Sequence, residues 1–298
     1  MVLRKLGWIT CETIGEAFRS GESPLVTADD MHLVRALRGR GVEVQPLVWR
    51  RDDPLGVDCD ACLVRTPWDY QEDAAGFLGW LEALSGTGMR VAHDPALLRW
   101  NIEKTYLAEL GRRGARVIPT VYLDVDDPRS LVEVASEAGW SEVVLKPVIA
   151  AGGLDTYRLG MAEMVAFAPR YRALLAEKAM MLQPFLPEVL VKGEWSLIFF
   201  GGEYSHSVRK VPKGGEFRVQ DKHGGRACAE EAEREVRDVA EKILDSVGQT
   251  LLYARVDGIV QEDGFTLIEL EIFEPELFFR MDAGAADRFA EVLRRWWS

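Results

Sequence analysis

The sequence predicts an α/β protein with a doubly wound parallel sheet in its N-terminal third and an antiparallel sheet toward its C-terminus. Up to residue 92, short apolar runs alternate with amphipathic helical segments, which is the pattern of parallel βαβ units. Later, two pairs of strand-like runs are joined by short turns that contain Gly201 and Gly264, which is typical of hairpins. With 298 residues, 48% of them hydrophobic, the chain is long enough for two or three structural units.

The composition restricts the partners and the location of the protein. A formal net charge of −12 and an isoelectric point near 5.0 oppose a general attraction to nucleic acid or to anionic membranes, so we expect small-molecule partners instead. No run approaches the roughly 18 apolar residues of a membrane span, and the N-terminus lacks the features of a secretory leader, so we expect a cytoplasmic protein. Four cysteines are too few for a disulfide scaffold, so we expect reduced thiols.

The N-terminal third supplies the parallel sheet. Residues 27–38 place Met31, Val34 and Leu37 on one face of a helix. The other expected elements are strands over 42–49, 61–65 and 90–92 and a helix over 73–84. In a doubly wound sheet the ligand crevice lies beyond the carboxyl ends of the strands, and the second of these strands delivers Arg65 to such an end.

Two further groups of elements follow. The central group contains a helical connection over 93–114, strands over 117–123, 142–147 and 180–186, and helices over 130–139 and 162–177. The C-terminal group contains a hairpin over 194–208, a glycine-rich polar segment over 213–227, a helix over 229–247, strands over 251–260 and 265–273, and a helix over 285–297.

The last predicted strand carries an unusual pair of acids. Glu269 and Glu271 are two residues apart in an apolar run, so their side chains leave the same face of a pleated strand. If Arg255 and Asp257 of the preceding strand share that face, three carboxylates converge and need cations, since an unpaired buried carboxylate costs several kcal/mol. Hard oxygen ligands without His or Cys suit Mg²⁺. The alternative is that the acids lie on the solvated face of an edge hairpin.

Two basic segments suggest a polyanionic ligand. Lys146 ends an apolar strand and is followed by the loop 150–153, whose glycines let backbone amides approach an anion closely. The alternative is a surface lysine before a turn. The second segment, around residues 209–226, is glycine-rich and locally basic, as expected of a loop that closes on a substrate, or of a solvated loop. Neither a Walker loop nor a G-x-G-x-x-G turn is present in the sequence.

Cys59 and Cys62 form a C-x-x-C motif. No second cysteine pair or histidine pair supplies the other ligands of a zinc site. The alternatives are metal or redox use and small apolar residues that lead into a strand.

Taken in order, the motifs resemble those of the ATP-grasp superfamily over nearly the whole chain. The segments that carry the resemblance are NIEKTYL, VVLKP, AAGG, MLQPFLPEV, KGEWS, SVRKVPKGGEFRVQ followed by GGR, YARVDGI and LIELEIFEP. Bacterial glutathione synthetases and the cyclo-ligase that closes the ring of cycloserine are similar in character. The resemblance implies an ATP-grasp fold with an N-terminal α/β domain (1–98), a central α+β lid subdomain (99–182) and a C-terminal α+β subdomain with an antiparallel sheet and the metal site (183–298).

The resemblance also implies roles for individual residues. Phosphates of ATP would be bound by Lys104, Lys146 and the loop with Ala151, Gly152 and Gly153. The adenine would meet Gln183, Pro184, Phe185 and Leu186, and the ribose would meet Glu194. Catalytic charges would come from Arg255, Lys210 and Arg218, and Mg²⁺ or Mn²⁺ would be held by Asp257, Glu269 and Glu271.

The implied activity is an ADP-forming carboxylate–amine ligase that uses an acyl phosphate and acts on small carboxylate and amine substrates, with a ring-closing cyclo-ligase as one form of it. Two departures argue against a glutathione synthetase proper, because Glu271 and Ser196 stand where many relatives have asparagine and arginine. A small-molecule kinase and an ATP-binding regulator without turnover are the alternatives. We expect residues around 65–70 to bind the acceptor substrate. The alternative is that Trp68 and Tyr70 belong to the core. The C-terminal tryptophans leave a homodimer possible.

Overall fold

The computed structural model describes residues 2–20 and 25–297, and its first sheet is parallel throughout, with strand order β2-β1-β3-β4. The elements are β1 (Lys5–Thr10), α1 (Glu12–Ser20), α2 (Leu25–Arg38), β2 (Glu43–Val48), β3 (Ala61–Thr66), α3 (Ala74–Gly86), β4 (Val91–Ala92) and α4 (Pro95–Ile102). The parallel sheet is thus confirmed. The pattern did not predict β1 and α1, and Gly7 interrupts the apolar run of β1.

Helices cover both faces of this parallel sheet. Leu33 and Leu37 of α2 belong to the same buried cluster as Leu6 of β1, on one face. Phe77 and Leu81 of α3 belong to a second cluster with Ile9 and Val64, on the other face. The sheet is therefore doubly wound, as predicted.

The central unit is an antiparallel sheet in the order β5-β8-β6-β7 with helices packed on it. Its elements are α5 (Tyr106–Arg112), β5 (Val121–Leu123), α6 (Leu131–Glu137), β6 (Glu142–Pro147), β7 (Tyr157–Gly160), α7 (Met161–Glu177) and β8 (Met180–Pro184). The edge strand β7 was not predicted, because four residues are too few to show a period. The division of the chain after residues 98 and 182 stays a prediction, and the second boundary falls within β8.

The C-terminal sheet has five antiparallel strands in the order β11-β10-β9-β12-β13. Its elements are α8 (Glu188–Val191), β9 (Glu194–Phe200), β10 (Glu203–Val211), β11 (Arg226–Ala229), α9 (Arg234–Asp245), β12 (Tyr253–Gln261), β13 (Gly264–Glu271) and α10 (Ala285–Trp296). Both predicted hairpins are present. In residues 2–20 and 25–297, no helix is long and apolar enough to cross a bilayer.

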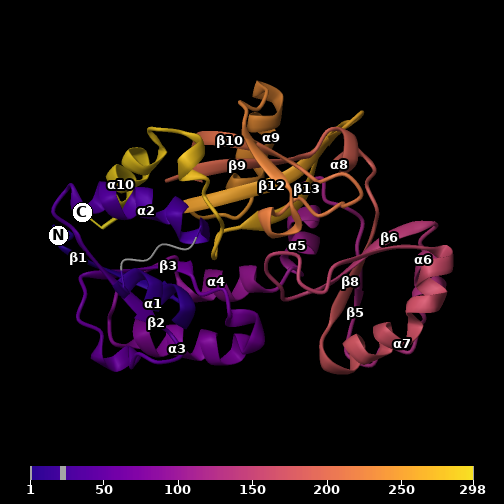
Figure 1. The fold of residues 1–298 in the computed structure, drawn as a ribbon, viewed down its shortest axis with the longest axis horizontal. Coiled ribbons are helices and arrows are strands. Elements are labelled where there is room, and N and C mark those ends of the chain that lie inside the picture. The colour runs from indigo at the N-terminus through magenta and orange to yellow at the C-terminus, as the bar shows by residue number, and fades with distance from the viewer. Residues whose placement is uncertain (1, 21–24, 298) are drawn as a thin grey trace.

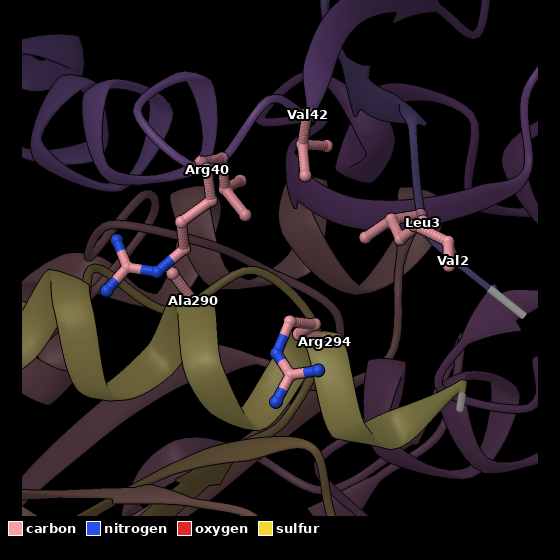
Figure 2. A pocket seen from close by; sticks show the side chains of 7 residues that line it. Val2, Leu3, Arg40, Val42, Ala290 and Arg294 are labelled. Atoms are coloured by element: carbon pink, nitrogen blue, oxygen red, sulfur yellow. The ribbon is translucent and has the colours of Figure 1, made fainter.

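One continuous core joins the first and third units. Trp8 of β1, Phe200 of β9 and Phe289 of α10 belong to the same buried cluster. Figure 1 shows α2 and α10 side by side and the central unit as a lobe at the other end of the molecule. Trp297 is buried in this core and the half-buried Trp296 packs against it, while the homodimer stays a prediction.

His93 lies buried at the joint between these two units. The carbonyl of Ile272 lies 3.0 Å from Nδ1, and Nε2 accepts a hydrogen bond of 2.8 Å from the backbone N–H of Leu252. A neutral ring with the proton on Nδ1 satisfies both contacts. Burial lowers the pKa of His93 to about 4, because the charged form has no access to water.

We expect His93 to make the protein sensitive to acid. Its folded pKa lies below the ordinary value near 6.5, so its contribution to stability is present above pH 6.5 and is lost as the pH falls toward 4. The loss should reach about 3 kcal/mol. Urea unfolding of the wild type and of His93→Gln between pH 4 and 7 measures it. At pH 7 the variant should be less stable than the wild type, and its free energy of unfolding should not fall in the same way between pH 7 and pH 4. An equal pH dependence of the two proteins would contradict the assignment.

Candidate active site

Four charged side chains meet on the last two strands of the C-terminal sheet. In the register of β12 and β13, Arg255 lies opposite Glu271 and Asp257 lies opposite Glu269. Asp257 and Arg255 are buried, and the two glutamates are half-buried. The two faces therefore coincide, as the sequence analysis supposed, and the acids do not form a fully solvated face.

Protein cations neutralise these carboxylates. Lys104 Nζ lies 3.1 Å from Glu269 Oε1. Arg255 Nη2 lies 2.8 Å from Asp257 Oδ2 and also contacts Glu271. These ion pairs supply the positive charge that two like charges on one strand face require.

Lys210 of β10 extends this array to the next pair of strands. Its ammonium contacts Glu194 and lies 3.3 Å from Asp257 Oδ2. Ser196 Oγ donates a further hydrogen bond to Asp257 Oδ1. Lys210 is only 6% exposed, so both of its ion pairs are shielded from water. Asp257 is thus held between Lys210 and Arg255.

The acids respond differently to this shared burial. Burial raises the pKa of Asp257, but Arg255 and Lys210 outweigh it and hold the pKa at about 2. For Glu271, burial dominates over Arg255, and the nearby acids add to it, so its pKa is well above the ordinary value. The array therefore combines one carboxylate whose charged form the neighbouring cations favour with one whose charged form burial disfavours.

Lys146, at the end of β6, faces the same array without a partner of its own. It is half-buried, and in the described part of the chain no carboxylate lies within ion-pair distance of its ammonium. Burial lowers its pKa, while Glu269 and Glu194 attract it only from a distance. A partly desolvated ammonium without an ion pair is suited to receive an anionic ligand.

The glycine loop of the central unit packs against the basic segment of the C-terminal unit. Gly152 and Gly153 have left-handed φ angles of 60° and 74°. A Cβ on Gly152 would lie 2.8 Å from Lys222 Nζ, and one on Gly153 would lie 3.6 Å from Arg218 Cδ. Arg218 itself pairs with Glu216 at 2.8 Å. The left-handed φ favours glycine at residue 152, and a Cβ there would displace the flexible end of Lys222.

The same loop is tied to Lys104 and to the first unit. Lys104 Nζ donates a 2.6 Å hydrogen bond to the carbonyl of Ala150, and its backbone N–H donates to the carbonyl of Val148 at 3.0 Å. Ala151 packs against the core under α3. Lys104 thus connects the predicted phosphate loop directly to Glu269 of the predicted metal site.

An apolar cluster lies where the central and C-terminal units meet. Its members are Val144, Phe185, Leu186, Val189, Phe217, Val219, Ile259 and Ile268. Gln183 precedes it and donates a hydrogen bond of 2.9 Å to Thr120 Oγ1, and Pro184 ends β8 beside it. The guanidinium of Arg158 covers the Phe185 ring at 3.8 Å. Apolar side chains next to a buried amide are the kind of surroundings that a planar base prefers, and the adenine role stays a prediction.

The expectation that Arg65 reads the acceptor is not supported. Arg65 is fully buried, and its Nη2 donates to Asp30 at 2.8 Å and to the carbonyl of Pro275 at 2.9 Å. Tyr70 is core as well, since it packs edge-on against Phe273 at 4.6 Å. The core alternative was thus right for Tyr70, and Arg65 fixes the loop after β13 to the first unit.

Trp68 and Glu274 form the side of the site that faces the first unit. Trp68 Nε1 donates a hydrogen bond of 3.3 Å to the carbonyl of Glu274. The side chain of Glu274 lines a small hollow together with Lys104, Glu269 and Glu271. Burial raises the pKa of Glu274 to about 7. Sequence reasoning missed this residue, although it lies within the quoted segment LIELEIFEP.

Side chains from α4 and α5 hold the acidic strand in place. The amide of Asn101 donates to the carbonyl of Leu270 at 2.8 Å and accepts from the N–H of Ile272 at 3.1 Å. The hydroxyl of Tyr106 accepts from the N–H of Leu270 at 2.9 Å. Because β13 is an edge strand, these contacts satisfy backbone groups that would otherwise be exposed. Both residues lie within the quoted segment NIEKTYL, but the sequence analysis gave neither of them a role.

The donor set fits a hard divalent cation. Asp257, Glu269 and Glu271 offer carboxylate oxygens, with neither thiol nor imidazole beside them, which is the chemistry that Mg²⁺ prefers. Within residues 2–20 and 25–297, no three acidic, His or Cys side chains converge as a preformed metal site. Lys104 and Arg255 contact all three of these carboxylates instead, so a cation would have to compete with these ion pairs.

Comparison with known proteins shows what the chain is similar to. Residues 7–93 match the family described as D-cycloserine synthetase DcsG, N-terminal domain, and residues 116–283 match the prokaryotic glutathione synthetase, ATP-grasp domain. The cycloserine biosynthesis protein DcsG of Streptomyces lavendulae is 29% identical, over 88% of this chain and 91% of that protein. The glutathione synthetase of Parasynechococcus marenigrum (strain WH8102) is 28% identical, over 95% and 87%.

Solved structures agree with these matches. The crystal structure of D-cycloserine synthetase DcsG superposes with a TM-score of 0.83 at 26% identity, covering 99% of this chain and all of that one. The D-alanine–D-alanine ligase of Bacillus anthracis superposes with a TM-score of 0.70 at 14% identity, which shows the fold alone, covering 99% of each chain. The predicted ATP-grasp fold is therefore confirmed, and the chain belongs to the ATP-grasp ligase family, with an ATP-grasp domain of the prokaryotic glutathione synthetase type.

Proposed function

We propose that this protein is an ADP-forming carboxylate–amine ligase that acts on a small amino acid or peptide-like substrate. The observation that carries the proposal is Lys146, a half-buried ammonium without an ion pair that faces a neutralised array of carboxylates. Such an arrangement suits the simultaneous arrival of a polyphosphate and a divalent cation. The relative named for cycloserine biosynthesis supports a small amino acid-like substrate, and makes ring closure one specific version to test.

Each residue of the array has a role in this proposal. Lys104 and Lys146 bind phosphate oxygens of ATP, while Asp257, Glu269 and Glu271 would hold Mg²⁺, which would supply positive charge for the transferred phosphoryl group. Arg255 stabilises that group, with Lys210 and Arg218 as further sources of positive charge. A substrate carboxylate oxygen attacks the γ-phosphorus and ADP leaves, and an amine nitrogen then displaces phosphate from the acyl phosphate.

The experiment that tests the proposal is a substrate screen with three readouts. Purified protein, ATP and Mg²⁺ are incubated with amino acids and with hydroxamate or ureido analogues, and ADP, free phosphate and product mass are measured. A ligase releases phosphate only when both the acid and the amine groups are present. A stable phosphorylated product would favour the kinase alternative, and the absence of ADP with every substrate would favour a regulator. The proposed location is the cytoplasm, where ATP is available.

Gly152 offers a direct test of the phosphate loop. Gly152→Ala puts a Cβ 2.8 Å from Lys222 Nζ at a φ of 60°, so we expect an apparent KM for ATP raised by about tenfold, or 1.4 kcal/mol. Gly139→Ala is the matched control, because Gly139 has a φ of 75° but no atom within 4 Å of the added Cβ. Both variants should lose about 1 kcal/mol of stability. An equal KM for ATP in the two variants would remove Gly152 from the site.

A further inference from the structure

Two thiols lie together at the start of the first sheet, away from the carboxylate array. Cys59 precedes β3, and Cys62 is the second residue of β3, opposite Gly7 of β1. Arg65 and Trp68 leave the other end of the same strand, toward the active site. The pair is therefore separate from the site described above.

Gly7 provides the room in which both sulfur atoms meet. A Cβ on Gly7 would lie 2.7 Å from Cys62 Sγ and 3.4 Å from Cys59 Sγ, and it would also lie 2.6 Å from a methyl group of Leu47. Any other residue at this position of β1 would collide with the thiols. Both sulfur atoms therefore lie around the same point beside Gly7, and Cys59 Sγ also donates to Gln45 Oε1 at 4.0 Å.

The two thiols have different environments. Cys62 is fully buried, whereas Cys59 is half-buried and reachable from solvent. The neighbouring Cys62 thiol, together with the charge of Lys5, lowers the pKa of Cys59 despite its burial. The neighbouring Cys59 and burial raise the pKa of Cys62. An accessible thiol with thiolate character beside a buried one is the arrangement of an attacking and a resolving cysteine.

We propose that Cys59 and Cys62 form a thiol–disulfide exchange site whose substrate is a low-molecular-weight disulfide. The Cys59 thiolate attacks one sulfur of that disulfide, which forms a mixed disulfide and releases one thiolate. Cys62 then gives its proton to solvent or to the released thiolate, attacks Cys59 Sγ, and releases the second thiol. The protein loses two S–H bonds and gains one disulfide, and the small disulfide is reduced to two thiols.

The first step prepares the second. As long as Cys59 is a thiolate, its proximity and its charge raise the pKa of Cys62. Both effects disappear once Cys59 is bound to another sulfur, so only burial still opposes ionisation of Cys62. Cys62 therefore becomes a nucleophile only after Cys59 has reacted.

The other two cysteines serve as internal comparisons. Cys11 is buried, and burial raises its pKa. Cys228 is exposed on β11. We expect Cys228 to collect adducts without ring closure, so the test uses a Cys228→Ser background. Cys59 is outside the proposed ligase site, so Cys59→Ser should retain phosphate release with any substrate that the screen identifies.

The experiment incubates the full chain in buffers of oxidised and reduced glutathione, blocks free thiols by alkylation, and locates modifications by peptide mass spectrometry. The parent protein should lose two hydrogens in the peptide that holds both cysteines. Cys62→Ser should accumulate a glutathione adduct on Cys59, at least about tenfold above the parent protein. Cys59→Ser should show neither product.

Three results would overturn the proposal. The first is that both cysteines of the parent protein remain open to alkylation in fully oxidised glutathione. The second is that the parent protein accumulates the adduct on Cys59 without forming the Cys59–Cys62 disulfide. The third is an adduct that forms on Cys62 as fast as on Cys59. Denatured protein, assayed in parallel, shows whether the preference for Cys59 depends on the folded contacts with Gly7 and Lys5.

Discussion

Glu269→Gln is expected to abolish ADP formation, with a loss of turnover of roughly 10²–10³-fold or more. The amide keeps the shape of the side chain but removes the negative charge that pairs with Lys104 at 3.1 Å and that the proposal assigns to the metal. Glu269 is half-buried, and Lys104 keeps its hydrogen bond to Ala150, so the fold should tolerate the change. ADP release at saturating ATP and Mg²⁺, together with a thermal melt, measures both effects.

The matched control for this variant is Glu262→Gln. Glu262 is an exposed acid in the turn between β12 and β13, so its replacement changes the net charge of the same hairpin without touching the array. Its turnover and melting temperature should equal those of the wild type. If Glu269→Gln also turned over normally, the carboxylate array would have no part in catalysis.

Lys146→Ala is expected to raise the apparent KM for ATP by about 10–100-fold, which corresponds to about 1.4–2.8 kcal/mol of lost binding. The reason is that Lys146 has no ion pair among the described residues, so its charge is available for phosphate oxygens. Loss of an unpaired, partly desolvated ammonium should leave the melting temperature without nucleotide unchanged or slightly higher. The thermal shift that ATP produces should be much smaller than in the wild type.

Lys242→Ala on α9 is the control, because Lys242 is an exposed lysine on a helix of the same protein. Titration of ATP with both variants, by turnover and by thermal shift, separates a local effect from a general loss of positive charge. An ATP dependence of Lys146→Ala that matches the control would contradict a phosphate-binding role.

Much of the fold was accessible from local patterns. The strand over 142–147 and the helix over 162–177 have enough residues for their periods to stand out, and both agree with the structure to within one residue. The missed strands β7 and β11 have four residues each and lie at sheet edges, where contacts with a neighbouring strand decide the conformation. Short elements of this kind carry too little pattern to be recognised alone.

The sequence by itself determined which charges the candidate site contains. The spacing of Glu269 and Glu271 puts both on one strand face, and the order of the motifs gave the ATP-grasp fold. Only the tertiary structure decided how those charges are balanced: Lys104 arrives from the segment between α4 and α5, Lys210 from β10, and Lys146 stays without a partner.

Tertiary packing also decided the fate of the residues near the first unit. Arginine is a residue type that often binds substrates, yet Arg65 is buried and bonds to Asp30 and to the carbonyl of Pro275. Glu274, which the sequence analysis did not single out, lines the hollow beside the carboxylate array. The physical reason is that the interaction energy and the pKa of a charged group depend on its distances to other charges and to water. The groups concerned are far apart in the chain, so only folding sets these distances. A local pattern identifies the charged residues, and only the packed chain determines which residues surround them.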